Sequence, residues 1–312
     1  MENPHFAFFE GLIVPIEEAK ISIMTHALHY GTAAFAGLRA YWEADDHQLY
    51  LFRPLDHFRR FRASAEMLYI DLPYTPEQLR DIAISLLQRE GYHTDTYLRP
   101  LVYKSQPTIG VRLHDLTSDI AMFALPFGSY MEHEEGINVT VSSWRRVDDN
   151  AIPPRGKICG AYVNSALTKT EATLDGFDDA LVLDQEGHVA EASAANFFMV
   201  RNGKVITPPV YANILEGITR NTCRTLLLNE LCMDIEERPI DRTELFSADE
   251  AFLCGTAVQI AAITSVDHHR IGGGVMGPVV KELRRLFFRM VHGKLSHYRH
   301  WVEPVYSMEA IH

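Results

Sequence analysis

The order of strand-like and helix-like segments is the feature that most constrains the fold. Near the N-terminus, Phe6–Phe9 and Leu12–Pro15 flank Glu10-Gly11, a pattern that predicts a β-hairpin. Further along, apolar residues recur at helical spacing after Pro54, whose missing N–H costs nothing in a first helical turn. Strand-like and helical segments are mixed without strict alternation, which favours two α+β domains over a doubly wound parallel sheet.

The remaining segments follow the same mixed order. We expect further strands at residues 38–42, 48–52, 97–103, 120–125, 137–142, 180–183, 197–200 and 204–206, and one that ends at Leu253 before a turn at Gly255-Thr256. We expect further helices after Pro76, from Gly217, and over residues 277–291.

A loop-like stretch divides the chain. Residues 126–130 read PFGSY and are followed by the charged run 132–136, EHEEG, a composition typical of a linker. With 312 residues the chain is long enough for two domains with separate cores. We therefore expect an N-terminal α/β domain at 1–126, an interdomain loop at 127–136, and a C-terminal α/β domain at 137–312 that carries Lys157.

Charge and cysteine content exclude several classes of partner. The formal net charge of -12 predicts an acidic surface that repels nucleic acid and anionic lipid. Apolar runs are broken by charges, and the N-terminus has no basic region before an apolar stretch, so neither a membrane span nor a signal peptide is expected. The four scattered cysteines suit a reducing cytoplasm. His26 and His29 have no third ligand nearby, so no metal site is expected.

Lys157 stands out among the seven lysines of the chain. It lies in IPPRGKICGAY, after two prolines and between Gly156 and Gly160, where the backbone is tightly constrained. A lysine that forms a Schiff base needs a fixed position and a free amine. A surface lysine in a Pro/Gly loop is the alternative, and on the local sequence alone it is the commoner case.

Other segments supply what a pyridoxal cofactor needs. Glu191, in GHVAEASAANFF, is expected just before a strand, among small residues that let a ring approach, and a carboxylate there could keep the ring nitrogen protonated. The helix beginning at residues 216–220 offers backbone N–H groups and Thr219 to a phosphate. Residues 254–257, CGTA, offer a second hydroxyl at a strand end. Each could be an ordinary cap or turn, but together they provide every group that the cofactor requires.

Nine segments in order make the chain recognisable over almost its whole length. They read MTHALHYGTAAFAGLRAY, HFRRFRASA, YLRPLVY, VSSWRR, IPPRGKICGAYVNSAL, EASAANFF, LEGITRNT, DEAFLCGTA and GPVVKELRRLFF. The chain resembles branched-chain amino acid aminotransferases, in the class IV (fold-type IV) group of pyridoxal-phosphate enzymes. The resemblance implies a two-domain α+β fold with the active site at the domain interface.

The resemblance also implies roles for individual residues. At the cofactor, it implies that Lys157 bonds pyridoxal 5'-phosphate and moves the substrate's α-proton, that Tyr162 donates to the phenolic oxygen, that Glu191 faces the ring nitrogen, and that the phosphate is bound by Arg60, Ile218, Thr219 and Thr256. At the substrate, it implies a pocket of Phe35, Gly37, Tyr130 and Ala257, with Arg99 for the side-chain carboxylate of glutamate and Tyr30 reaching in from a partner subunit.

The implied activity is reversible transamination between leucine, isoleucine or valine and 2-oxoglutarate, in a homo-oligomer (dimer or hexamer) that shares its sites between subunits. D-amino acid transaminases, R-selective amine transaminases and aminodeoxychorismate lyase share the fold, but YLRPL together with HYGTxxFxG favours the branched-chain type. A non-catalytic phosphate-binding scaffold is the alternative of another class, and the intact Lys157, Tyr162 and Glu191 argue against it.

Four positions depart from the family's usual pattern. Ala36 replaces a usual glutamate, Ala195 an acid that is often present beside Asn196, and Glu216 a usual proline. Phe127 stands where some relatives have a larger aromatic residue. None of the four belongs to the cofactor set, so they leave the cofactor prediction intact and leave the breadth of substrates open, because pocket walls set specificity by small energy differences.

Overall fold

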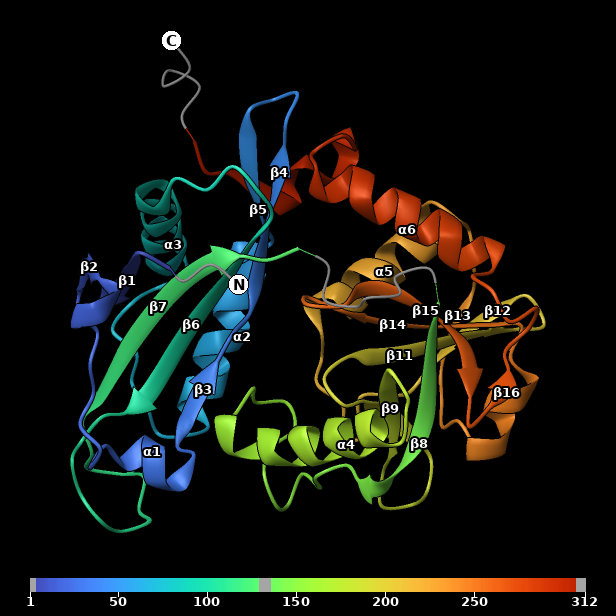
Figure 1. Ribbon diagram of the computed structural model, residues 1–312, viewed down its shortest axis with the longest axis horizontal. Helices are drawn as coiled ribbons and strands as arrows, with labels where there is room; N and C mark the ends of the chain where they lie inside the picture. Colours follow the sequence, from blue (N-terminus) through green and yellow to red (C-terminus); the bar gives the residue numbers. More distant parts are fainter. Residues whose placement is uncertain (1–3, 129–135, 307–312) are drawn as a thin grey trace. The chain divides into compact units, whose positions relative to one another are not determined.

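The computed structural model describes residues 4–128 and 136–306 (Figure 1). Within this range the chain forms two compact units. The first contains residues 4–128, 156–160 and 289–306, and the second contains residues 136–155 and 161–288. This division differs from the expected continuous C-terminal domain at 137–312, because Lys157 and the last strand of the chain pack with the first unit.

The first unit is built on an antiparallel sheet with the strand order β17-β5-β4-β6-β7-β1-β2, and β3 pairs with β6. Its strands are β1 (Phe6–Phe9), β2 (Leu12–Pro15), β3 (Ala33–Phe35), β4 (Leu38–Glu43), β5 (Gln48–Phe52), β6 (Thr96–Lys104), β7 (Ser118–Pro126) and β17 (Val302–Pro304). The expected β1–β2 hairpin is confirmed. Its turn residues Glu10 and Gly11 both have positive φ (49° and 84°), as a two-residue turn that matches strand twist requires.

The helices of the first unit are α1 (His26–Tyr30), α2 (Pro54–Glu66) and α3 (Pro76–Glu90), with the short 3₁₀ segments Ile16–Glu18 and Ser296–Trp301. Among them, α3 is capped at both ends by its sequence. At the start of α3 the Thr75 side chain accepts from the Gln78 N–H, and the Gln78 side chain accepts from the Thr75 N–H. The helix ends at Gly91 in a left-handed conformation (φ 70°). In Figure 1, α2 and α3 pack against each other, α2 against β3, and α3 against β1 and β7.

The second unit is built on a mixed sheet with the order β10-β9-β8-β15-β14-β11-β12-β13, and β16 pairs with β15. The pairs β8–β9, β8–β15 and β12–β13 are parallel, and the others are antiparallel. Its strands are β8 (Ile137–Arg145), β9 (Asp179–Leu183), β10 (Val189–Ala192), β11 (Asn196–Arg201), β12 (Lys204–Thr207), β13 (Ile235–Glu237), β14 (Glu250–Gly255), β15 (Gln259–Val266) and β16 (His269–Arg270).

Helices α4 (Tyr162–Leu174), α5 (Ile218–Asn229) and α6 (Pro278–Val291), with the 3₁₀ segments Cys159–Ala161 and Arg242–Ser247, complete the chain. α4 packs on β8 and β9, and α5 packs on β13 and β14. The core of this unit contains apolar side chains from the inner strands, including Phe197, Leu253 and Ile263. No helix in the described ranges is both long and apolar enough to cross a membrane.

The α+β class is confirmed, and the elements differ from expectation in a few places. The strand expected to end at Leu253 continues to Gly255. Glu191 lies inside β10 and not just before a strand, because the short β10 pairs with β9. The sequence pattern does not predict helix α4, because its first turn directly follows a glycine-rich loop.

Candidate functional site

Lys157 is held by its backbone from two sides within the first unit. Its N–H donates to the Ser64 side-chain oxygen on α2 at 3.1 Å, and its carbonyl accepts from the Phe35 N–H at 3.0 Å. Ser64 in turn donates to the Arg60 carbonyl. The half-buried Lys157 Nζ lies 5.0 Å from the centre of the Phe35 ring. These contacts distinguish Lys157 from an ordinary surface lysine in a loop.

Positive charge gathers around the same part of α2. The buried His57 side chain has a pKa well below its usual value, first because burial disfavours the charged form, and then because of the neighbouring Arg60, Arg53 and Lys157. His57 is therefore neutral at physiological pH. The cations around it make this face of α2 suited to an anionic ligand.

The Phe35 ring has two cationic neighbours, Arg99 and Lys157. The guanidinium carbon of Arg99 is 4.4 Å from the Phe35 ring centre, while Lys157 contacts the same ring. Arg99 also donates from Nε and Nη2 to the Tyr97 hydroxyl at 3.2 and 3.0 Å. A Cβ atom at Gly37 would overlap that hydroxyl, so glycine is required for Tyr97 to lie there. The first unit thus brings Phe35, Gly37, Arg99 and Lys157 together.

Tyr97 is a residue of this region that the sequence patterns do not single out. The signal was available, because residues two apart on a strand face the same side and Arg99 was already a candidate.

Phe127 packs beside Tyr97, with 5.3 Å between the two ring centres, and the Arg39 guanidinium lies 5.1 Å from the Phe127 ring. Ala36 is buried, with its N–H donating to the Pro100 carbonyl. Tyr130 lies outside the described residues.

Tyr30 ends the short helix α1 and contacts the loop around Gly110. Its hydroxyl accepts from the Gly110 N–H at 3.1 Å, and the buried His26 contacts the Gly110 carbonyl through Nε2 at 2.6 Å. His26 Nδ1 is engaged by Thr32. Both ring nitrogens of His26 therefore have protein partners. In the described ranges we find no cluster of three or more His, Cys, Asp or Glu residues suited to a metal ion.

In the second unit, Glu191 is buried and receives donors on both carboxylate oxygens. Arg146 Nη2 contacts Oε1 at 2.7 Å, and the Glu191 side chain is 5% exposed. Oε2 accepts from the Asn196 amide at 2.9 Å and from the Leu215 N–H at 3.2 Å. These charge-assisted hydrogen bonds hold the carboxylate in one orientation.

Asn196 connects this carboxylate to the start of α5. Its amide also donates to the Leu215 carbonyl at 2.8 Å, and a Cβ atom at Gly217 would overlap its side-chain oxygen. Gly217 is the N-cap of α5 and has no side chain with which to cap the helix. The first turn, Ile218 and the buried Thr219, therefore presents backbone N–H groups of the kind that bind phosphate.

The remaining candidates lie at chain turns of the second unit. Thr256 and Ala257 form the turn between β14 and β15, as expected. Tyr162 is the first residue of α4. Ala195 is buried in the tight connection between β10 and β11, where its carbonyl accepts from the Ala192 N–H. Glu216 is exposed and pairs with Arg155 at 3.5 Å, which gives this residue a surface partner.

The comparisons with known proteins agree with one another. The family model described as amino-transferase class IV matches residues 34–266. The chain is 48% identical over 302 residues to the "Probable branched-chain-amino-acid aminotransferase" of Aquifex aeolicus (strain VF5), and the alignment covers 97% of each chain.

Two solved structures are similar over almost the full chain. The PLP-form of the branched-chain amino acid aminotransferase from Thermobaculum terrenum is 36% identical, with a TM-score of 0.94 and coverage of 98% of this chain and 100% of that one. The branched-chain aminotransferase from the thermophilic archaeon Thermoproteus uzoniensis, solved with norvaline, is 38% identical, with a TM-score of 0.93 and coverage of 97% of this chain and 100% of that one.

Proposed function

Because the chain belongs to the amino-transferase class IV family, we propose that it is a branched-chain amino acid aminotransferase. It transfers the amino group of leucine, isoleucine or valine to 2-oxoglutarate, reversibly, with pyridoxal 5'-phosphate as cofactor. The observation that carries the substrate assignment is that both Lys157 and Arg99 lie against the Phe35 ring. An aromatic wall suits an apolar side chain, and the guanidinium beside it suits the side-chain carboxylate of glutamate.

The residues fit the cofactor in their chemistry. Glu191 is a buried carboxylate of the kind that a protonated ring nitrogen needs. Gly217, the N-cap of α5, has no side chain that could cap the helix, and Thr219 lies in the first turn. We assign the phosphate to Arg60, Ile218, Thr219 and Thr256, the ring nitrogen to Glu191, and the phenolic oxygen to Tyr162.

Pyridoxal phosphate, when bound, supplies a protonated ring that accepts the electron pair released at the substrate's α-carbon. Lys157 would hold the cofactor covalently between turnovers, and its Nζ would take the substrate's α-proton and return it. The fixed backbone of Lys157 keeps this amine in place, since its N–H and carbonyl are both bonded to the first unit. In the proposed substrate pocket, Gly37, Tyr130 and Ala257 accompany Phe35 and Arg99.

We propose a homo-oligomer in which Tyr30 reaches the site of a partner subunit. Support comes from the apolar side chains around it, because Ile23, Leu28, Ile109 and Val111 are 81%, 61%, 84% and 78% exposed. Apolar residues gathered on a surface are typical of an interface. The expected cytoplasmic location rests on the cysteines, all four of which are free thiols, and stays a prediction.

The deciding test is glutamate production from leucine plus 2-oxoglutarate by purified protein with added cofactor. Lys157→Ala should lower the turnover by at least about 10³-fold, the scale expected when a general acid–base group is lost. Lys281→Ala, which removes an exposed lysine of α6, is the matched control and should retain full turnover.

Three results would contradict the proposal. Turnover of D-alanine or of an R-amine in place of L-leucine would identify another activity of the same fold. Borohydride reduction of the holoenzyme should fix the cofactor on the peptide containing Lys157. A label elsewhere would overturn the lysine assignment, and the absence of any label would indicate a non-catalytic scaffold.

A further inference from the structure

We propose that Arg146 is a positioning residue that acts through Glu191 and makes the protein select a cofactor ring with a basic nitrogen. The inference rests on the proposed function, in which Glu191 faces that nitrogen. Arg146 lies directly after β8, and no role for it was recognised in the sequence. Its guanidinium is 2.7 Å from the Glu191 carboxylate, and the two side chains are 10% and 5% exposed.

The Arg146 side chain has little freedom to move. Its backbone N–H donates to the Leu183 carbonyl at 2.8 Å, and its own carbonyl accepts from the Gln185 side chain at 2.8 Å. Its Nε donates to the Asn213 carbonyl at 2.9 Å. The guanidinium Nε is therefore bound to the backbone of the segment before α5, while Nη2 contacts Glu191. A lysine could not make both contacts from one rigid plane.

The two oxygens of Glu191 have different neighbours. Oε1 contacts the charged Arg146, whereas Oε2 accepts from the neutral Asn196 amide and the Leu215 N–H. A buried carboxylate without a charged partner takes up a proton more readily, because desolvation penalises the anion. Arg146 thus places an opposite charge beside Oε1 before any ligand arrives. An ionised carboxylate can accept from a protonated ring nitrogen, whereas a carboxyl oxygen that carries a proton cannot.

The test compares pyridoxal phosphate with its 1-deaza analogue, which has carbon in place of the ring nitrogen. Dissociation constants for both are measured by fluorescence titration on the apoproteins of wild type, Arg146→Met, Glu191→Gln and the double variant. Arg146→Met should weaken binding of pyridoxal phosphate at least about tenfold and leave the deaza analogue nearly unchanged. In the Glu191→Gln background the same substitution should have an effect below about twofold, because the partner through which it acts is gone.

Arg145→Met is the matched control, since it removes the same charge one position away, from an exposed side chain that donates to the Asp184 carbonyl. It should leave both constants unchanged. Arg146→Lys, which keeps the charge and loses the fork, should restore part of the preference for pyridoxal phosphate. It also provides the measurement if Arg146→Met does not fold.

Equal losses for both ligands in Arg146→Met, or the same loss with and without Glu191, would mean that Arg146 is only structural and would overturn the inference. If Glu191→Gln itself leaves the preference for the ring nitrogen unchanged, Glu191 is not the ring's partner, and the assignment in the proposed function fails with it. If Glu191→Gln loses the preference for the ring nitrogen but the Arg146 variants keep it, only the inference about Arg146 fails.

Discussion

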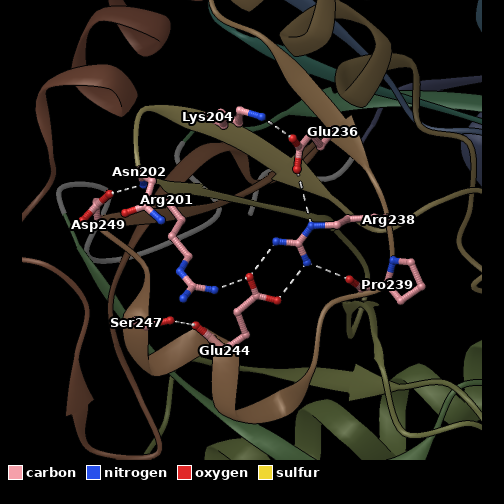
Figure 2. Close-up of polar contacts among 9 residues, drawn as sticks. All are labelled: Arg201, Asn202, Lys204, Glu236, Arg238, Pro239, Glu244, Ser247 and Asp249. Atoms are coloured by element: carbon pink, nitrogen blue, oxygen red, sulfur yellow. Dashed lines mark hydrogen bonds and ion pairs between the residues drawn. The ribbon is translucent and has the colours of Figure 1, made fainter.

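Glu191 and Glu244 are two carboxylates of the second unit that arginines hold, and they differ in their surroundings. Glu244 accepts from Arg238 at 2.9 and 2.6 Å and from Arg201 at 2.6 Å. Figure 2 shows this cluster continuing through Glu236 to Lys204. Both arginines are 36% exposed, and the hydrogen bond from Arg238 is the main cause that lowers the pKa of Glu244 to about 2.

Glu191 is more deeply buried, and its neighbours include neutral groups of the segment that leads into α5. Glu244 pairs with two arginines, and their network ends at the exposed side chain of Lys204. The number of donors around a carboxylate therefore does not identify its role. Burial, and the attachment of its donors to a ligand-binding helix terminus, separate the two.

The largest contrast is expected in activity. Glu191→Gln should lower kcat at least about 10²-fold, because the ring loses the charge that holds its proton. Glu244→Gln should leave kcat within about twofold of wild type, since it touches no proposed ligand group. Transamination kinetics at saturating cofactor measure both. An equal loss of kcat in fully folded Glu244→Gln would remove the distinction.

Gly217→Ala is expected to disturb the Glu191 region without touching Glu191. The new methyl group would displace the Asn196 amide and break its bonds to Glu191 and Leu215. Cofactor affinity should fall by about tenfold, as expected for the loss of hydrogen bonds to a charged group. Gly273→Ala, at an exposed glycine where a new methyl group would make only ordinary van der Waals contact, is the control for titration by fluorescence. Unchanged affinity in Gly217→Ala would show that Asn196 is not coupled to the cofactor.

Glu244→Gln should instead lower the free energy of unfolding by about 1 kcal/mol at pH 7, a modest value because both arginines are partly exposed to water. The folded pKa of about 2 lies below the ordinary 4.5, so the stabilisation is present above pH 4.5 and is lost as pH falls towards 2. Urea unfolding of both proteins from pH 7 to 3 should show their difference shrinking. A constant difference would contradict the assignment.

The smallest effect is expected at the edge of the cluster in Figure 2. Lys204 and Glu236 form an ion pair of 2.6 Å, but their side chains are 54% and 39% exposed. Water screens such a pair, so Lys204→Met should not move the thermal midpoint beyond experimental error. A shift as large as that of Glu244→Gln would mean that the whole network acts as one unit.

Local features of the fold were predictable because a few adjacent residues determine them. The β1–β2 hairpin follows from Glu10-Gly11, and α3 follows from Thr75, Pro76 and the apolar spacing after them. The pairing of β17 with β5 joins residues at opposite ends of the chain, and the sequence contains no local signal for it. Residues 156–160 also lack a local signal for the first unit with which they pack, so the sequence predicts them in the C-terminal domain.

The candidate site shows the same limit. The resemblance marked Lys157 and Glu191, and each is held in the structure by several contacts. Arg146 lies within the motif VSSWRR, yet its contact with Glu191 joins residues 45 positions apart and depends on the strand order β10-β9-β8. Such neighbours come from tertiary packing, which single-sequence patterns do not encode.

The late position of β17 in the chain has a consequence for synthesis on the ribosome. Val302 pairs with Phe52, Val305 donates to the Leu49 carbonyl, and Gln48 donates to the Tyr306 carbonyl. Between Phe52 and Val302 the ribosome adds about 250 residues, which takes roughly 12–50 s at typical elongation rates. During that interval β5 presents an open edge of the kind that nascent chains must protect. The second unit is thus fully synthesised before the first, which starts earlier, can close.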